Sequence, residues 1–362
     1  MRRLLPGLGR RAPQGDPHEP GPAAPPGSTS PPRGTASGDG RGRLGSFPDG
    51  MPSDPGAAFR SLDLLVRRHL DGLLQGDHVG VRLGSGSDPE EVVRYRPGED
   101  DVRRIDWNVT ARTGDPHVWR SRAEHELDTW VLVDETASMD FGTARCEKRD
   151  LATFAAAVIA LLTDGPGNRI GLCRLTPGGV AWQPALPGRV AARRVTHAAA
   201  AYEQNGRAEP GPPGPTLAQG LVGLQRRVPR PGLRVVISDF VEPDGSSERP
   251  LPWERELRRL ASRHDVIVVE VLDPRELELP DLGLLLLTDP ESGARQEVWT
   301  SKKLRRRYAQ AAAEHRAAVA AGVQACGADH VVLRTDTDWV RELARFVVTR
   351  RRAATHPRRM PR

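Results

Sequence analysis

The chain has 362 residues, a formal net charge of +6 and 28% charged residues. It is longer than most single domains, and no apolar run reaches the roughly twenty residues that a membrane-spanning helix needs, so we expect a cytoplasmic protein without a membrane segment. Its three cysteines are widely spaced and form no Cys-x-x-Cys pair, which argues against a disulfide framework and against a zinc site.

The two ends of the chain differ in composition from the middle. Residues 1–57 are rich in Pro, Gly, Ser and Arg, so we expect a disordered leader, and either Met1 or Met51 fits as the start. Residues 351–362 form a basic tail. The six arginines between 350 and 362 equal the whole excess charge, so the remaining chain is balanced. Lysine occurs only at positions 148, 302 and 303, which suggests a GC-rich coding sequence rather than a selected basic surface.

Residues 58–127 are predicted to hold an N-terminal helix and a charged, tryptophan-containing segment. From Phe59 to Leu74 the apolar residues recur every three or four positions, as in a helix with one buried face. A short strand over 92–96 and a Pro-Gly turn at 97–98 follow. These elements lead into the charged run.

Charges alternate with apolar side chains over residues 101–112, around Trp107. We interpret this run as a packing clasp, that is, a structural segment held against the fold by its own side chains. In it, Trp107 lies in the core and Asp106 pairs with Arg104 or Arg112. The alternative is a polar patch beside a metal-binding loop.

The apolar residues 130–133 predict a strand buried on both faces, and polar side chains follow at its carboxyl end. Asp134, Thr136 and Ser138 have the spacing Asp-x-Thr-x-Ser, so one tight loop can turn a carboxylate and two hydroxyls inward. Ligands bind at this end of the strands in open α/β sheets. Converging oxygen atoms suit Mg²⁺ or another hard divalent cation, although so short a cluster alone is also typical of a helix cap.

Two further polar positions come in the order that a metal site needs. Thr216 opens a predicted helix after a Gly/Pro-rich loop, and Asp239 ends a second buried strand that begins at residue 235. Together, the set resembles the metal-ion-dependent adhesion site of a von Willebrand factor A-type domain: Asp134, Thr136, Ser138, Thr216 and Asp239. That family usually has Asp-x-Ser-x-Ser, so Thr136 keeps the hydroxyl and adds a methyl group. The resemblance implies that the hydroxyls bind Mg²⁺ or Mn²⁺ directly and that the two carboxylates hold the ion through water.

A second resemblance covers about residues 58–350. Three pieces are similar to the bacterial family called domain of unknown function 58: the Tyr-x-Pro-Gly turn at 95–98, the run Arg104-Ile105-Asp106-Trp107 with Ala111-Arg112, and the Asp134 loop with its continuation at 138–142. Members are typically encoded beside MoxR-type AAA+ ATPases and are thought to act as their adaptors. Many carry membrane helices, and this chain looks like the short soluble type. The family usually has Gly-Asp-Asp after the turn, whereas residues 98–101 here read Gly-Glu-Asp-Asp.

After the Asp134 loop, helices and strands alternate as in an α/β, doubly wound, mostly parallel sheet, which we place over residues 128–350. We predict helices over 147–162, 190–202, 253–263, 302–325 and 338–350. We predict further strands over 168–175, 266–272, 284–287 and 330–334.

Together these features predict a metal-dependent protein-interaction module, an adaptor or co-chaperone of a MoxR-type AAA+ ATPase, and not an enzyme. The resemblance leaves one position on the ion open, which an Asp or Glu of the partner would fill. A strand that ends in Asp also resembles haloacid-dehalogenase-type phosphotransferases, but Thr136 stands where their second Asp lies, so the nucleophile would lack its proton partner. The other alternative is a weak nucleic-acid binder that acts through the basic tail.

Overall fold

The computed structural model describes residues 51–52, 54–74, 91–95, 102, 105–120, 127–165, 167–205, 214–242, 245–288 and 295–355. The predicted leader up to residue 50 and the tail after residue 355 lie outside these ranges. Within these ranges, no helix has the length and apolar character needed to cross a membrane.

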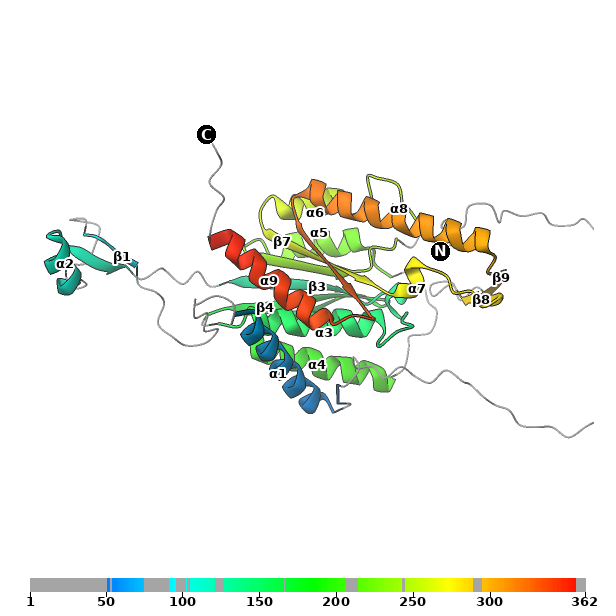
Figure 1. Cartoon of the computed structure of the whole chain (residues 1–362), viewed down its shortest axis with the longest axis horizontal. Coiled ribbons are helices and arrows are strands. Elements are labelled where there is room, and N and C mark those ends of the chain that lie inside the picture. The colour runs from blue at the N-terminus through cyan, green and yellow to red at the C-terminus, as the bar shows by residue number, and fades with distance from the viewer. Residues whose placement is uncertain are drawn as a thin grey trace, which may run out of the picture.

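A six-stranded sheet forms the centre of the molecule (Figure 1). Its strands are β3 (Asp128–Asp134), β4 (Arg169–Thr176), β5 (Gly179–Leu186), β6 (Leu233–Ser238), β7 (Asp265–Leu272) and β10 (Asp329–Arg334). The order is β10-β7-β6-β3-β4-β5, and every neighbouring pair is parallel except β4 and β5. The chain winds outward from β3 in both directions, which confirms the predicted doubly wound, mostly parallel sheet.

Helices cover both faces of the sheet because side chains alternate along each strand. In β3, Val131 and Val133 point into one hydrophobic cluster and Leu132 into the other. The first cluster lies under α1 (Pro55–Leu74), α3 (Lys148–Leu162), α4 (Gly188–Asn205) and α9 (Trp339–Thr355). The second lies under α5 (Leu217–Arg227), α6 (Glu254–Ala261) and α8 (Lys302–Cys326).

Helix α3 is the most deeply placed helix of the first layer. Every residue of α3 except Asp150 is buried, because the helix packs between the sheet and the outer helices α1, α4 and α9. Its alanine-rich sequence permits this close packing on all sides. Its first turn therefore carries two charged side chains, Lys148 and Arg149, into the interior.

A small antiparallel ribbon precedes the sheet: β1 (Glu91–Arg94) pairs with β2 (His117–Arg120), and α2 (Trp107–Thr113) lies between them in the sequence. The side chain of Asp106 caps α2 by accepting hydrogen bonds from the N–H groups of Asn108 and Val109. Trp107, in the first turn of this short helix, is 71% exposed. The predicted clasp with Trp107 in the core is therefore wrong, because Asp106 serves as a helix cap and the indole points to solvent.

A second antiparallel ribbon follows β7 by way of the short helix α7 (Pro274–Leu277). It consists of β8 (Leu284–Thr288) and β9 (Arg295–Trp299). The strand predicted over 284–287 is thus present, but it pairs with β9 and not with the central sheet. Edge strand β5 was not predicted, because Pro184 breaks its pattern and its side chains are mostly half-buried or exposed.

The folded body extends slightly beyond the predicted boundaries. Helix α1 begins at Pro55, and Met51 packs against the first hydrophobic cluster. Helix α9 continues to Thr355, and Arg350 forms ion pairs with Asp265 and Asp329. Arg350 is consequently part of the folded body and not of a free tail.

Candidate functional site

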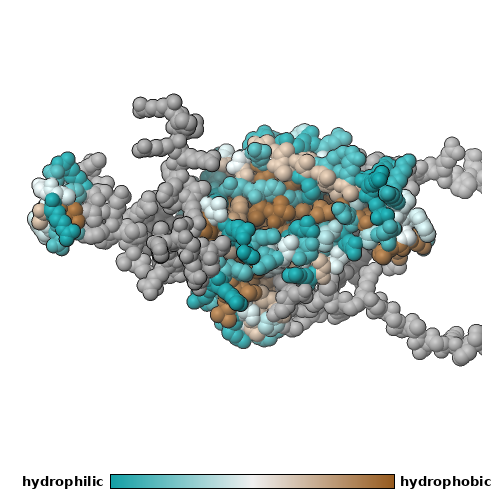
Figure 2. All heavy atoms as spheres, viewed as in Figure 1, coloured by the Kyte–Doolittle hydropathy of each residue, from teal (hydrophilic) through white to brown (hydrophobic). Residues whose placement is uncertain are grey.

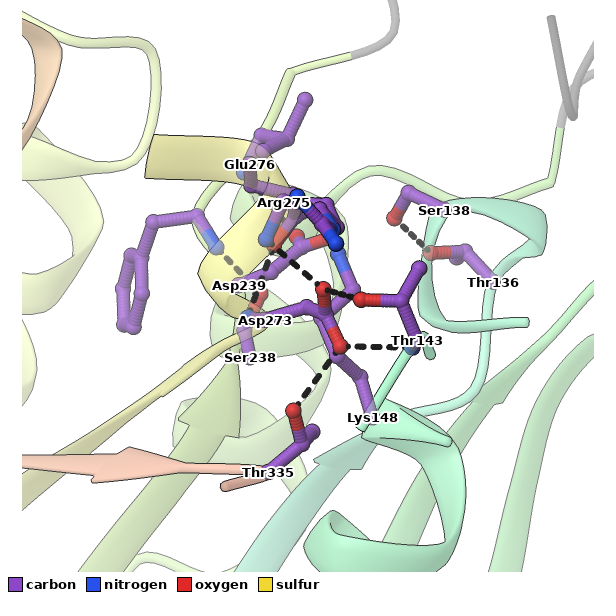
Figure 3. A network of polar contacts seen from close by, with 12 residues as sticks. Thr136, Ser138, Thr143, Lys148, Ser238, Asp239, Asp273, Arg275, Glu276 and Thr335 are labelled. Carbon is purple, nitrogen blue, oxygen red and sulfur yellow. Dashed lines mark hydrogen bonds and ion pairs between the residues drawn. The ribbon is translucent and has the colours of Figure 1, made fainter. Parts of the chain in front are cut away.

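Polar side chains from four loops meet at the carboxyl edge of the central sheet (Figure 3). The loops follow β3, β6, β7 and β10, which are four consecutive strands of the sheet. Because parallel strands end at the same edge, Asp134 at the end of β3 comes beside Ser238 and Asp239 at the end of β6.

Asp134 is buried and receives hydrogen bonds from hydroxyl groups. Thr136 donates to Asp134 Oδ1 from its backbone N–H at 3.0 Å and from its hydroxyl at 2.7 Å. Ser238 donates to Asp134 Oδ2 at 2.7 Å, and the Ser138 hydroxyl lies 3.3 Å from that of Thr136. Burial raises the pKa of Asp134, and the negative charge of Asp239 raises it further. The loop therefore gathers the predicted carboxylate and hydroxyls at one place.

Asp239 is fully buried and is paired with a lysine. Lys148 Nζ, from the first turn of α3, donates to Asp239 Oδ2 at 2.7 Å and to Glu276 Oε1 at 2.5 Å. Asp239 Oδ1 accepts from Val241 N–H at 3.0 Å, and a side-chain hydrogen bond joins Asp239 to Ser138. Burial by itself would raise the pKa of Asp239, but the Lys148 charge and these hydrogen bonds outweigh burial and lower it. The same two carboxylates raise the pKa of Lys148 against its burial, so the amine stays protonated.

A third buried carboxylate, Asp273, follows β7 and ties neighbouring loops together (Figure 3). It accepts hydrogen bonds from the Thr143 N–H at 2.8 Å and hydroxyl at 2.5 Å, from the Thr335 hydroxyl at 2.8 Å and from the Arg275 N–H at 2.9 Å. Thr143 lies in the loop after β3 and Thr335 in the loop after β10. All of these donors are uncharged, so this carboxylate is satisfied as a buried acceptor.

The backbone next to Asp239 adopts a conformation that is rare for its residue type. Phe240 has φ of 56°, in the left-handed region that favours glycine. Two contacts hold it there: its N–H donates to Ser238 Oγ at 3.0 Å, and its ring packs edge-on against Trp253 with centroids 5.1 Å apart. Such backbone strain is concentrated at functional sites, which supports a role for this loop.

Thr216 lies at the start of α5, as predicted, and acts there as a helix cap. Its hydroxyl accepts from Gln219 N–H at 3.3 Å, and the Gln219 side chain accepts from Thr216 N–H at 3.0 Å. Among the hydrogen bonds of the described residues, none joins Thr216 to Asp134 or Asp239. Its part in a metal site stays a prediction.

The donor atoms of this cluster are the hard oxygens that Mg²⁺ and Mn²⁺ prefer. In the described part of the chain, no group of three or more His, Cys, Asp or Glu could hold a metal, so an ion here needs the hydroxyls of Thr136 and Ser138. The charge balance fits such an ion. The buried Asp134 and Asp239 and the half-buried Glu276 are three neighbouring carboxylates, and Lys148 is bonded to only the last two. Of these three, Asp134 has no cation among the described ion pairs. Asp273 has none either, but it accepts four hydrogen bonds from uncharged donors.

Several members of the cluster were not predicted from the sequence, among them Lys148, Ser238 and Glu276. Lys148 carries a signal, because it is one of only three lysines in an arginine-rich chain. Ser238 precedes Asp239 at a strand end, where its hydroxyl could have been counted with the others. Glu276 carries no local signal, because only the tertiary fold brings α7 to the first turn of α3.

Comparisons with known proteins give a family and several distant structural matches. A family model described as Protein of unknown function DUF58 matches residues 91–318. Over 298 residues the chain is 47% identical to the uncharacterized protein Rv1480 of Mycobacterium tuberculosis, covering 82% of this chain and 90% of the relative. Over 138 residues it is 45% identical to the uncharacterized protein MAV169 of Mycobacterium avium, covering 38% of this chain and 78% of that protein.

The similar solved structures include BatB from Bacteroides thetaiotaomicron, a conserved hypothetical protein. It is 12% identical, covers 62% of this chain and 99% of its own, and has a TM-score of 0.37. A von Willebrand factor type A structure from Catenulispora acidiphila is 16% identical, covers 61% of this chain and 41% of its own, and has a TM-score of 0.31.

Proposed function

The chain belongs to the family of proteins of unknown function DUF58, and from this premise and its buried carboxylate cluster we propose that it is a metal-dependent protein-interaction module. The proposal rests on one observation above all. Asp134 is a buried carboxylate beside a second one, Asp239, and the cluster holds a single amine that is bonded elsewhere. A divalent cation beside Asp134 supplies the positive charge that this arrangement lacks.

Asp134, Thr136, Ser138 and Asp239 would hold the ion, with Thr216 as the further ligand expected from the resemblance. The ion would supply a Lewis-acidic position for an oxygen ligand from outside, and the carboxylate of a partner protein is the natural one. The chain's own residues prepare this position: Thr136 and Ser238 orient Asp134, while Lys148 neutralises Asp239.

We assign no catalytic step to this site. A phosphotransferase of the haloacid-dehalogenase type needs a second carboxylate two residues after the nucleophile, and Thr136 stands there. The hydroxyl of Thr136 is engaged as a donor to Asp134 at 2.7 Å, so it does not serve as a base. Binding, rather than turnover, is the activity that this arrangement supports.

The partner that we propose is a MoxR-type AAA+ ATPase, for which the chain would act as a cytoplasmic adaptor or co-chaperone. Family resemblance alone names this ATPase. The metal site would select the partner's carboxylate, while the surrounding surface would supply much of the affinity, because exchanging water for a carboxylate on Mg²⁺ gives a modest net gain.

Calorimetric titration with Mg²⁺ tests the metal site directly. We expect saturable heat for the wild type and none for Asp134→Ala. Asp265→Ala is the matched control, since it removes a carboxylate at the amino end of β7, on the opposite edge of the sheet. Equal heats for all three proteins would contradict the proposed metal site at Asp134.

Capture of the purified ATPase encoded in the same genome tests the partner. EDTA and Thr216→Ala should both weaken capture, whereas truncation after Thr355 should change mainly its dependence on salt. Turnover of a generic phosphoester that is abolished by Asp134→Asn would instead favour the phosphotransferase.

A further inference from the structure

The β8–β9 ribbon presents an apolar strip to solvent. The strip consists of Leu282, Leu284, Leu286 and Trp299, which are 66%, 56%, 53% and 68% exposed. Leu284 pairs with Trp299 across the ribbon, and Leu286 lies two residues along the same strand, so these side chains share one face. Val298 faces the other way and is 7% exposed. Figure 2 shows hydrophobic residues at the end of the molecule where Figure 1 places this ribbon.

Cations lie immediately beyond the strip, in the first two turns of α8. This basic turn spans residues 302–307, in which Lys302, Lys303 and Arg306 are exposed, and no acidic residue lies in the first turn of the helix. Cations are unfavourable at the positive end of a helix dipole, and Lys302 and Arg306 also repel each other at a spacing of four residues. Arg305 of this turn forms an ion pair with Asp281 at 2.7 Å. Local helix stability therefore does not explain the basic turn, which an external anionic surface would stabilise.

The strip and the basic turn lie at the same edge of the molecule as the carboxylate cluster. Helix α7 connects them: Glu276 accepts from Lys148, and the Tyr308 hydroxyl of α8 donates to the Arg275 carbonyl at 3.4 Å. Figure 1 shows α7, β8 and β9 together at this end. A single partner can therefore reach both the cluster and the strip.

We propose that the apolar strip and the basic turn form the docking surface for an acidic protein partner that buries Leu and Trp side chains against its own apolar residues. This inference rests on the proposed function, since the partner is the one whose carboxylate the metal site receives. Apolar anchors with a cationic rim are typical of protein interfaces. An anionic membrane is the less fitting occupant, because exposed Glu297 lies directly opposite Leu286 on the strip and would be driven into lipid.

Binding of the purified MoxR-type ATPase, measured by biolayer interferometry with Mg²⁺ present, tests this surface. The strip variant Leu284→Ser/Trp299→Ser should raise Kd at least tenfold. The charge variant Lys302→Gln/Lys303→Gln should weaken binding at low salt and flatten its salt dependence. Val190→Ser on α4 is the control, because Val190 is 52% exposed and lies outside this surface. Unchanged Kd for both the strip and charge variants, with unaltered melting temperatures, would overturn the proposal.

A second measurement separates this surface from the metal site and from the choice of ATPase. If the strip variant loses binding while Asp134→Ala and EDTA have no effect, the docking surface stands and the metal-dependent function fails. If the ATPase does not bind the wild type, p-benzoylphenylalanine at position 299, with position 190 as control, is used for crosslinking in cells. Adducts with an acidic protein that disappear in Lys302→Gln/Lys303→Gln support the surface. Lipid adducts, or no adduct above the control, contradict it.

Discussion

Asp273 and Asp134 are both buried carboxylates at the carboxyl edge of one sheet, yet their surroundings differ. Asp273 accepts four hydrogen bonds from uncharged donors on the neighbouring loops. Asp134 also accepts from uncharged donors, but it lies beside the charge of Asp239, which adds to the effect of burial on its pKa. A carboxylate with its donors complete stabilises the fold, whereas a carboxylate beside a like charge is suited to receive a cation.

The largest expected effect comes from the lysine that neutralises one side of this cluster. Lys148→Met leaves the buried Asp239 and the half-buried Glu276 without their cation. We therefore expect the free energy of unfolding to fall by about 3–5 kcal/mol, as when one partner of a buried ion pair is removed. Chemical denaturation measures the loss. Added Mg²⁺ should recover part of it, and a stability equal to that of the wild type would show that the cluster is not ionised as described.

Asp273→Asn tests the structural carboxylate. The amide offers one acceptor oxygen to a site built from donors, so a buried donor left unpaired should cost on the order of 1–3 kcal/mol. This loss should be the same with Mg²⁺ and with EDTA, because Asp273 lies outside the proposed metal ligands. A stability loss that depended on Mg²⁺ would mean that Asp273 takes part in the metal site, as Asp134 is proposed to do.

For Asp134→Asn, unlike Asp273→Asn, the stability difference from the wild type should depend on Mg²⁺. Without divalent metal we expect little net loss of stability. The amide leaves one buried donor without its acceptor, but it also removes a carboxylate whose pKa is raised by burial and by Asp239. With Mg²⁺ at a hundred times its Kd, the wild type should gain about 2.7 kcal/mol and the variant nothing. Thermal melts with EDTA or Mg²⁺ give both answers, and a variant that still responded to Mg²⁺ would place the ion elsewhere.

The stability of the protein should depend on pH differently through these carboxylates and through a buried histidine. Burial lowers the pKa of His315 on α8 to about 4, below its ordinary value of about 6.5. The unfolded chain therefore takes up this proton at a higher pH than the folded chain does. The contribution of His315 to the free energy of unfolding is complete above about pH 6.5 and is lost as the pH falls toward 4. The loss amounts to about 2 kcal/mol at pH 5. Asp239, with its lowered pKa, loses its contribution only below its ordinary value of about 3.8.

Melts of the wild type and His315→Leu at pH 5 and pH 7.5 test this assignment. The leucine variant should lose less stability between the two pH values than the wild type does. Equal losses would mean that another group titrates in this range.

The smallest effect is expected at the ends of the chain. A protein of residues 51–355 keeps Met51, which packs on the core, and the ion pairs of Arg350. It should melt within about 2 °C of the full chain, since the residues removed have no periodic apolar face. A much larger drop would show that an end docks on the folded body.

The sheet was predictable because its strands are short apolar runs followed by polar loops. The burial of residues 131–133 and 235–237 follows directly from their composition. Strand β9 and edge strand β5 were not predictable in the same way, since each is stabilised by pairing with a neighbour and not by an apolar pattern. Trp107 shows the opposite error, because its hydrophobicity predicted burial and its place after a helix cap exposes it.

The candidate site was predictable where one loop supplies it. Asp134, Thr136 and Ser138 are close in sequence and lie together in the structure. Lys148 and Glu276 approach from α3 and α7 and depend on how the helices pack, which no local pattern encodes.

This scarcity of lysine has a practical consequence. Acylating reagents react with unprotonated amines that they can reach. Lys148 is wholly buried and is held protonated between two carboxylates. Lys302 and Lys303 are exposed and are the remaining lysines of the chain. Apart from the amino terminus, mild acylation of the folded protein should therefore label the neighbourhood of the β8–β9 ribbon alone. Protection of Lys302 and Lys303 from acylation would therefore report a partner bound at that surface.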